Sequence, residues 1–203
     1  METTETAEVI SRMTTTSPSK VAVDLCNTIA QINREIEKRF GPRPDPLQLH
    51  HPVAAKPGFW HTFEAQKIFE EARPYPGARE AVWEIYSRFG VIYLTSRPDW
   101  AHQTSRQWLE KNGFPRAPIV CTGDKKTSAR KYGVSAAIED SPRQIEALMP
   151  LVPVLVPARE YNACYPGRFF NWEEAVKFLE RREEVGHTGP FSSGISKEAA
   201  LSG

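Results

Sequence analysis

The sequence predicts an α/β fold in which a parallel sheet carries helices on both faces and a small helical cap follows the first strand. Two observations lead to this prediction. Short apolar runs alternate with segments of helical periodicity, which is typical of βαβ units. A long proline-rich stretch interrupts that alternation directly after the first apolar run. With 203 residues, the chain is long enough for one such domain with a modest insertion.

Five apolar runs are the expected strands. Each is short and almost continuously hydrophobic, as strands are when helices cover both faces of a parallel sheet. They lie at residues 21–23, 91–94, 119–121, 136–138 and 152–156. Because Pro153 lacks the N–H group that a central strand needs, we expect the last run at an edge of the sheet.

The segments after several of these runs begin with residues that favour helix starts. Asp99, and Ser141 followed by Pro142, are suitable caps for the helices after the second and fourth runs. Asn171, with Glu174 three residues later, resembles a capping box before the final helix. Strands and helices of this spacing support the alternating βα organisation.

The interruption covers residues 29–75 and is predicted to form the cap, with helices near 31–40 and 61–72 on either side of its prolines. It emerges at the carboxyl end of the first strand, where open α/β sheets bind ligands. The whole domain, cap included, is expected to span residues 19–185.

The composition excludes some classes of function. Lys and Arg total 26 against 25 for Asp and Glu, and the net charge of +1 does not favour nucleic acid or a membrane surface as a partner. No apolar run approaches the roughly 20 residues of a membrane span, and no signal peptide is visible, so we expect a cytoplasmic protein. The spacing of the cysteines does not suggest a metal site, and Cys121 and Cys164 are expected to be small buried residues. Residues 1–18 and 186–203 lack periodicity, which predicts two disordered tails.

Asp24 follows the first predicted strand and is the first candidate functional residue. A carboxylate at the end of a buried strand is costly unless it meets a cation or a substrate. Taken alone, Asp24 could equally well cap the following turn. Its interpretation therefore depends on what the other strands deliver to the same edge.

Polar residues after three later strands favour a functional interpretation of Asp24. Because parallel strands end at one edge of a sheet, these groups should converge there. Carboxylates suit a hard cation such as Mg²⁺, and hydroxyl and ammonium groups suit phosphate oxygens. The groups are Thr95, Ser96 and Arg97 after the second strand, Lys125 and Lys126 after the third, and Glu139 and Asp140 after the fourth.

The order of these groups resembles the four motifs of the haloacid dehalogenase (HAD) superfamily: a first motif that begins with Asp, then a Ser or Thr, a Lys and an acidic pair. The segments that most resemble its 5′(3′)-deoxyribonucleotidase-like (type C) branch are 75–78, 94–98, 108–113, 138–142 and 171–172. The resemblance covers residues 20–180. It implies a HAD-like Rossmannoid three-layer sandwich and a Mg²⁺-dependent phosphohydrolase. The substrate would be a small phosphomonoester, with a nucleoside monophosphate as one candidate.

The resemblance assigns a role to each candidate residue. Asp24 would be the nucleophile that forms an aspartyl-phosphate. Asp24 and Asp140 would bind Mg²⁺ with the main-chain carbonyl of Cys26, and Glu139 would act through water or by orienting these ligands. Arg97 could also contact the leaving group or form a surface salt bridge, and Lys126 remains an alternative to Lys125. The residues expected to hold the transferring phosphoryl group are Thr95, Ser96, Arg97 and Lys125.

Cys26 departs from the family pattern, which usually has a second Asp there to protonate the leaving oxygen and then activate water. A thiol is a poor general acid or base at neutral pH, and an ordinary packing role for Cys26 is compatible with every outcome. Good leaving groups could make the missing acid unnecessary. Alternatively, the protein could pass the phosphate from Asp24 to another acceptor as a phosphotransferase, or act as a weakened regulatory or ligand-binding module.

The expected cap contains aromatic residues that could contact the leaving group of a substrate. The candidates are Phe59, Trp60 and Phe63, although a small helical cap also needs such residues for its own core, and that ordinary role is favoured for each one. The adjacent His50 and His51 should point apart, which argues against a metal-binding pair. The sequence does not decide whether the protein forms a homodimer.

Overall fold

The computed structural model describes residues 20–184, in which six strands form one parallel sheet with the order β3-β2-β1-β4-β5-β6. The predicted tails, 1–18 and 186–203, lie outside the described residues. The central strand is β1, which pairs with β2 on one side and β4 on the other. The strands are β1 (Lys20–Val23), β2 (Val91–Thr95), β3 (Ile119–Cys121), β4 (Val134–Ile138), β5 (Val154–Pro157) and β6 (Arg168–Phe169).

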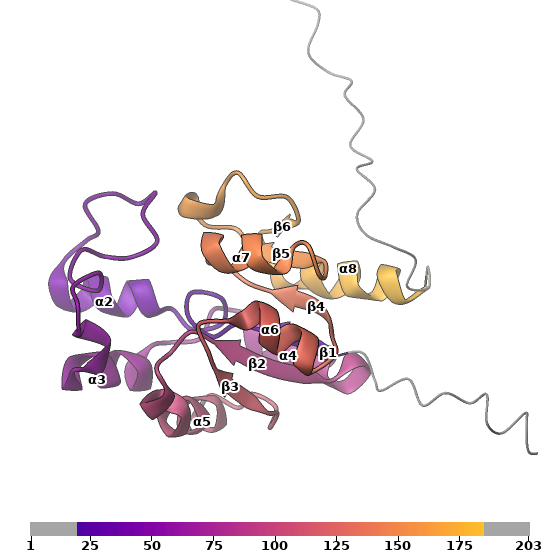
Figure 1. Ribbon diagram of the computed structural model, residues 1–203, viewed down its shortest axis with the longest axis horizontal. Helices are drawn as coiled ribbons and strands as arrows, with labels where there is room; N and C mark the ends of the chain where they lie inside the picture. Colours follow the sequence, from indigo (N-terminus) through magenta and orange to yellow (C-terminus); the bar gives the residue numbers. More distant parts are fainter. Residues whose placement is uncertain (1–19, 185–203) are drawn as a thin grey trace, which may run out of the picture.

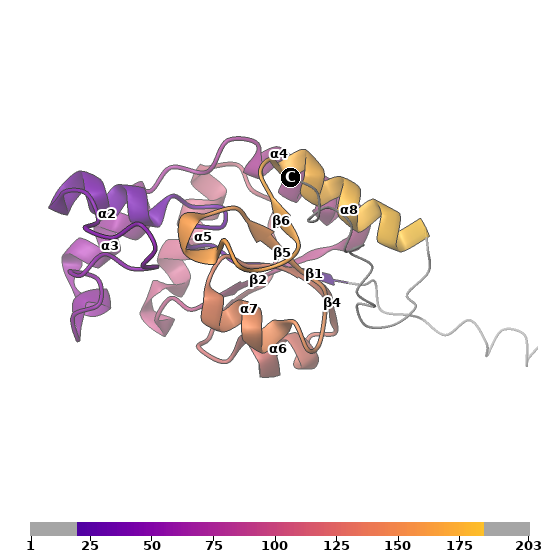
Figure 2. The ribbon, with the colours of Figure 1, turned by 90° about the horizontal axis from the view of Figure 1, so that it is seen from above.

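Helices cover both faces of this sheet (Figure 1). The helices α6 and α7 lie on one face, whereas α4 and α8 pack together on the other (Figure 2). This arrangement confirms the predicted three layers. The α-helices are α2 (Ile32–Phe40), α3 (Phe63–Glu71), α4 (Ala78–Phe89), α5 (His102–Lys111), α6 (Lys125–Lys131), α7 (Pro142–Leu148) and α8 (Trp172–Glu184), and the short 3₁₀ helices are η1 (Phe59–His61), η2 (Asp99–Ala101) and η3 (Glu160–Asn162).

Each face of the sheet has its own apolar core, because alternate residues of a strand point to opposite faces. In β1, Val21 and Val23 belong to the core that includes side chains of α4, α5 and α8. Ala22 between them belongs to the core under α6 and α7. The central strand that leads to Asp24 is therefore fixed from both sides.

Three local predictions differ from the structure. The last predicted strand, β5, is not at an edge but pairs with β4 and β6. Pro153 precedes β5 and contributes its carbonyl, which accepts a hydrogen bond from Ala137 N, so its missing N–H costs no ladder bond. The helix α5 follows Ala101 rather than Asp99, because Asp99 begins the 3₁₀ helix η2. Cys164, which was expected to be buried, is exposed.

The insertion after β1 lies beyond the carboxyl ends of the strands, at one end of the molecule (Figures 1 and 2). Its helices α2 and α3 contact each other, and α3 also packs against α5. Ile36 of α2 and Phe69 of α3 join the larger apolar core, which anchors the insertion to the sheet domain. Among the described residues, no helix has the length and apolar character that a membrane crossing requires.

Candidate active site

Four buried ionisable side chains meet at the carboxyl edge of the sheet. Asp24 follows β1, Glu139 and Asp140 follow the adjacent strand β4, and Lys125 is the first residue of α6. Each of the four residues is at most 5% exposed. The Nζ atom of Lys125 lies 2.5 Å from Oδ1 of Asp24 and 2.6 Å from Oε2 of Glu139. The convergence that the strand order predicts is therefore present in the structure.

This cluster contains three acids and one lysine. Burial raises the pKa of both Glu139 and Asp140 above the ordinary carboxyl range, and the nearby charge of Asp24 raises both further. Burial alone would lower the pKa of Lys125, but the adjacent carboxylates of Asp24 and Glu139 raise it above its ordinary value. One oxygen from each of the three acids lies within 4.8 Å of the others. Three acids whose oxygens lie this close together fit a hard divalent cation such as Mg²⁺, which binds carboxylates in place of their protons.

Asp140 is held in place by three side chains, and the sequence patterns did not indicate two of them, those of Tyr161 and Asn162. The hydroxyl of Thr28 donates to its Oδ1 at 2.8 Å, and the hydroxyl of Tyr161 donates to its Oδ2 at 2.7 Å. The side-chain amide of Asn162 donates to the main-chain oxygen of Asp140 at 3.1 Å. Burial and the charge of Asp140 raise the pKa of Tyr161, so its hydroxyl keeps its proton. Such outer contacts orient a metal-binding carboxylate.

The loop between Asp24 and α2 contains a residue in the left-handed region. Asn27 has φ 57°, which is uncommon outside glycine but tolerated by asparagine. Its side-chain Oδ1 accepts a hydrogen bond from Asn33 N at 2.8 Å. Its main-chain oxygen accepts two more from Arg159, at 3.2 Å from Nε and 2.7 Å from Nη2. These bonds fix the loop that carries Asp24 and Cys26.

A cavity of about 360 Å³ lies above the charged cluster, between the strand ends and the insertion. The charged cluster lines one end of it, and apolar side chains of the insertion line another part, including Ile32, Trp60 and Phe69. The rings of Trp60 and Phe69 are stacked, with centroids 5.4 Å apart. Two imidazoles, of His50 and His61, complete the wall on that side. The cavity thus joins an ionic end to a largely aromatic one.

Comparisons with known proteins match this architecture. A hydrolase of the haloacid dehalogenase-like family from Streptococcus pneumoniae aligns with a TM-score of 0.56 and 12% identity, over 79% of this chain and 98% of its own. A hydrolase of the same family from Xanthomonas campestris aligns with a TM-score of 0.51 and 16% identity, over 80% of this chain and 95% of its own. A candidate beta-phosphoglucomutase from Thermotoga maritima aligns with a TM-score of 0.51 and 16% identity, over 80% of this chain and 99% of its own. The chain has the haloacid dehalogenase fold.

Similarity in sequence is more distant than similarity in fold. Residues 61–138 match the family profile described as the LNS2 domain of PITM 1-3. A protein of Halalkalibacterium halodurans described as a candidate nucleotidase is 24% identical over 132 residues, which cover 60% of this chain and 68% of that protein. These similarities do not single out the type C branch within the haloacid dehalogenase fold.

The three polar residues that follow β2, the second motif of the predicted site, lie in different surroundings. Thr95 is fully buried, and its Oγ1 accepts a hydrogen bond from Arg97 N at 3.3 Å. Ser96 lines the cavity, where its Oγ accepts from Nε2 of Gln144 at 3.3 Å. Arg97 is only 3% exposed and donates from Nε to Sγ of Cys26 at 3.3 Å, so the alternative of a surface salt bridge is wrong.

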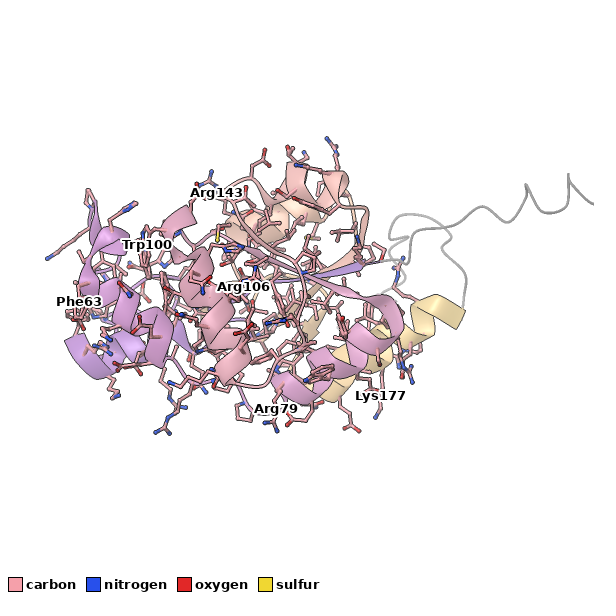
Figure 3. The ribbon with its side chains drawn as sticks, turned by 90° about the horizontal axis from the view of Figure 1, so that it is seen from below. Phe63, Arg79, Trp100, Arg106, Arg143 and Lys177 are labelled. Atoms are coloured by element: carbon pink, nitrogen blue, oxygen red, sulfur yellow. The ribbon has the colours of Figure 1, made fainter. Side chains whose placement is uncertain are left out.

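Other predicted candidates divide between the cavity and its surroundings. Lys125 lines the cavity, whereas Lys126 is not among the residues of its wall. Of the three aromatic candidates in the insertion, Trp60 lines the cavity. Phe59 packs against Trp60, and the centroids of their rings are 5.1 Å apart. Phe63 lies at the outer end of the insertion (Figure 3) and is 70% exposed. Helical periodicity could not distinguish these three positions relative to the cavity.

Proposed function

We propose that the protein is a Mg²⁺-dependent phosphohydrolase of small phosphomonoesters, with a nucleoside monophosphate as one candidate substrate. The proposal rests on one observation: Lys125 bridges Asp24 and Glu139 beside Asp140 at the base of a cavity. That combination of a buried carboxylate, a fixed cation and further acids suits phosphoryl transfer. The similarity to a candidate nucleotidase supports a phosphomonoester as substrate.

The proposed reaction has two displacements. The carboxylate of Asp24 attacks the phosphorus, the bond to the leaving oxygen breaks, and the phosphoryl group remains on Asp24. Water then attacks this phosphorus, which releases inorganic phosphate and regenerates the carboxylate. Lys125 holds Asp24 and stabilises negative charge at the phosphoryl oxygens. Mg²⁺, held by Asp24, Asp140 and the main-chain carbonyl of Cys26, would supply charge neutralisation for these oxygens.

Cys26 makes the second displacement the slower one in this proposal. Burial raises the pKa of its thiol, and the opposing effect of Arg97 does not cancel that rise. The thiol is therefore neutral near pH 7 and cannot accept a proton from water. A second candidate function is therefore transfer of the phosphoryl group from Asp24 to an acceptor that is already ionised, such as a carboxylate or phosphate oxygen, because that acceptor needs no base; the bond from the Asp24 oxygen to phosphorus breaks and regenerates the carboxylate.

The test is phosphate release from aryl phosphates and a panel of nucleoside monophosphates, with and without Mg²⁺. An Asp24→Asn variant should lose activity to the background rate, whereas Asp99→Asn, which changes an exposed acid of η2, should not. Intact-mass measurement of acid-quenched protein should show a phosphoryl adduct that requires Asp24. Full activity in Asp24→Asn, or no activity toward any of these esters with Mg²⁺ bound, would overturn the proposed function.

A further inference from the structure

Arg97 brings a buried positive charge to the wall of the cavity. Its Nε donates to Sγ of Cys26 at 3.3 Å, and its Nη1 donates to Oγ of Ser105 at 3.1 Å. Its Nη2 is buried and has no hydrogen-bond partner among the described residues. The guanidinium carbon lies 4.2 Å from the ring centroid of Phe69 in α3. Two of its three nitrogens are thus engaged by neutral groups, and the third is unused.

Within residues 20–184, the buried guanidinium of Arg97 lacks an anionic partner and an acceptor for Nη2. Taking a cation out of water is costly unless an anion and hydrogen-bond acceptors replace the water. No carboxylate among the described residues forms a salt bridge with Arg97, and the face of Phe69 offers only partial compensation. Arg97 lines the cavity, but Nη2 itself is closed off from solvent, so a bound molecule supplies the missing partner only when the guanidinium turns toward it.

The location of Arg97 indicates which part of a substrate that partner would be. Arg97 contacts Cys26 of the nucleophile loop on one side and Phe69 of the insertion on the other, so it lies where the ionic end of the cavity meets the aromatic end. Displacement at phosphorus is in line, so the leaving oxygen lies opposite Asp24. The other cation of the cluster, Lys125, is already engaged by Asp24 and Glu139.

We propose that the guanidinium of Arg97 turns toward a bound substrate and donates a hydrogen bond from Nη2 to the leaving oxygen, where it stabilises the negative charge that forms. This inference rests on the proposed function and concerns its first displacement. As Asp24 attacks, the bond from phosphorus to the leaving oxygen breaks, and the oxygen takes the electron pair. The guanidinium keeps all its protons, and the released oxyanion takes its proton from water. Arg97 therefore supplies positive charge where the carboxylic acid of the family pattern is absent.

The experiment measures how kcat/KM, which reports the first displacement even when the second is slower, depends on the acidity of the leaving group. A series of substituted phenyl phosphates is assayed with Mg²⁺ in wild-type protein, Arg97→Gln and Arg97→Lys, with Arg116→Gln, an exposed arginine, as the matched control. Removing one donor to a developing oxyanion costs about 10²- to 10³-fold in kcat. We expect that loss in kcat/KM for phenyl phosphate in Arg97→Gln and a loss below about tenfold for p-nitrophenyl phosphate, whose leaving group needs less stabilisation. The losses in Arg97→Lys should lie between those of Arg97→Gln and wild type, and the rates of Arg116→Gln should match those of wild type.

The comparison of leaving groups uses one preparation of each variant, so partial misfolding cancels. Inhibition by inorganic phosphate, which has no leaving group, should be unchanged in Arg97→Gln. An equal loss for all esters would overturn the role of Arg97 but leave the proposed function intact. Weaker phosphate inhibition in parallel with the rates would assign Arg97 to the transferring phosphoryl group instead. Wild-type protein that hydrolyses none of the aryl phosphates would overturn both proposals.

Discussion

Replacing Lys125 by Met tests the charge balance at the base of the cavity. Methionine keeps much of the apolar stem of lysine but removes the ammonium that lies 2.5 Å from Asp24 and 2.6 Å from Glu139. The lysine is 1% exposed and the two acids are at most 5% exposed, so water, which reaches them only from the cavity, replaces the lost contacts only in part. Removing one partner of a buried ion pair costs about 3–5 kcal/mol, and the upper end applies here because one ammonium serves two carboxylates. For a protein of this size, that corresponds to a fall in Tm of roughly 10–20 °C.

The loss of stability in Lys125→Met should grow as the pH rises. Without Lys125, Glu139 loses the ammonium that lowers its pKa, while burial and the charge of Asp24 still raise it, so its folded-state pKa lies above the unfolded value of about 4. The folded state then binds protons more tightly than the unfolded state, so its stability falls as the pH rises through that interval. The Tm difference between wild type and Lys125→Met should therefore be larger at about pH 8 than at about pH 5.

Differential scanning calorimetry of metal-free protein at both pH values measures this effect. Lys126→Met is the matched control, because Lys126 is the next residue of α6 and is partly exposed; its effect should stay within about 0.5 kcal/mol. Lys125→Met melting with wild-type Tm at about pH 8 would refute the reasoning. An equal loss at both pH values would refute it as well, since a packing defect alone has no such pH dependence.

Three further predictions concern the metal and Cys26. Tyr161→Phe removes the hydroxyl that donates to Asp140 at 2.7 Å and should weaken Mg²⁺ binding about 10- to 100-fold in calorimetric titration. The control Tyr165→Phe, which removes a hydrogen bond to the exposed Glu146, should leave Mg²⁺ affinity unchanged. Equal affinities in the two variants would contradict the orienting role of Tyr161. Burial raises the pKa of Glu139 and Asp140, so protons compete with the metal at low pH, and Mg²⁺ should raise Tm more at about pH 8 than at about pH 5.5; a pH-independent increase speaks against a carboxylate site. Stopped-flow assays of wild type should show a burst of released phenol, because hydrolysis of phospho-Asp24 lacks a base. Cys26→Asp should remove the burst and speed turnover by about 10²- to 10⁴-fold. A burst that persists in this variant would show that the thiol does not limit the second displacement.

The sheet and the charged cluster could be predicted from sequence because both depend on short, local patterns. A strand buried on both faces is a continuous apolar run, as in Val91–Thr95. The residue that follows such a strand is placed at the carboxyl edge by topology alone. Asp24 and the pair Glu139 and Asp140 therefore come together without any knowledge of loop paths.

Residues that reach the site from irregular segments could not be predicted in this way. Tyr161 and Arg159 come from the connection between β5 and β6, where no periodicity or spacing relates them to Asp140 or Asn27. The strand β6 itself has only two residues, too few to show a pattern. Their contacts depend on the path of the chain in three dimensions.

The contact between Cys26 and Arg97 links the unusual residue of the first motif to the unusual charge of the second. A carboxylate at position 26 would lie next to Nε of Arg97, where the thiol now accepts a bond at 3.3 Å, and would neutralise the guanidinium. Cys26→Asp therefore has two opposed effects. It supplies an acid for the leaving oxygen and a base for the second displacement, and it weakens the charge that Arg97 presents to that oxygen. Loss of the burst in Cys26→Asp, together with a smaller effect of Arg97→Gln on the first displacement in that background, would show that the two residues act as one unit.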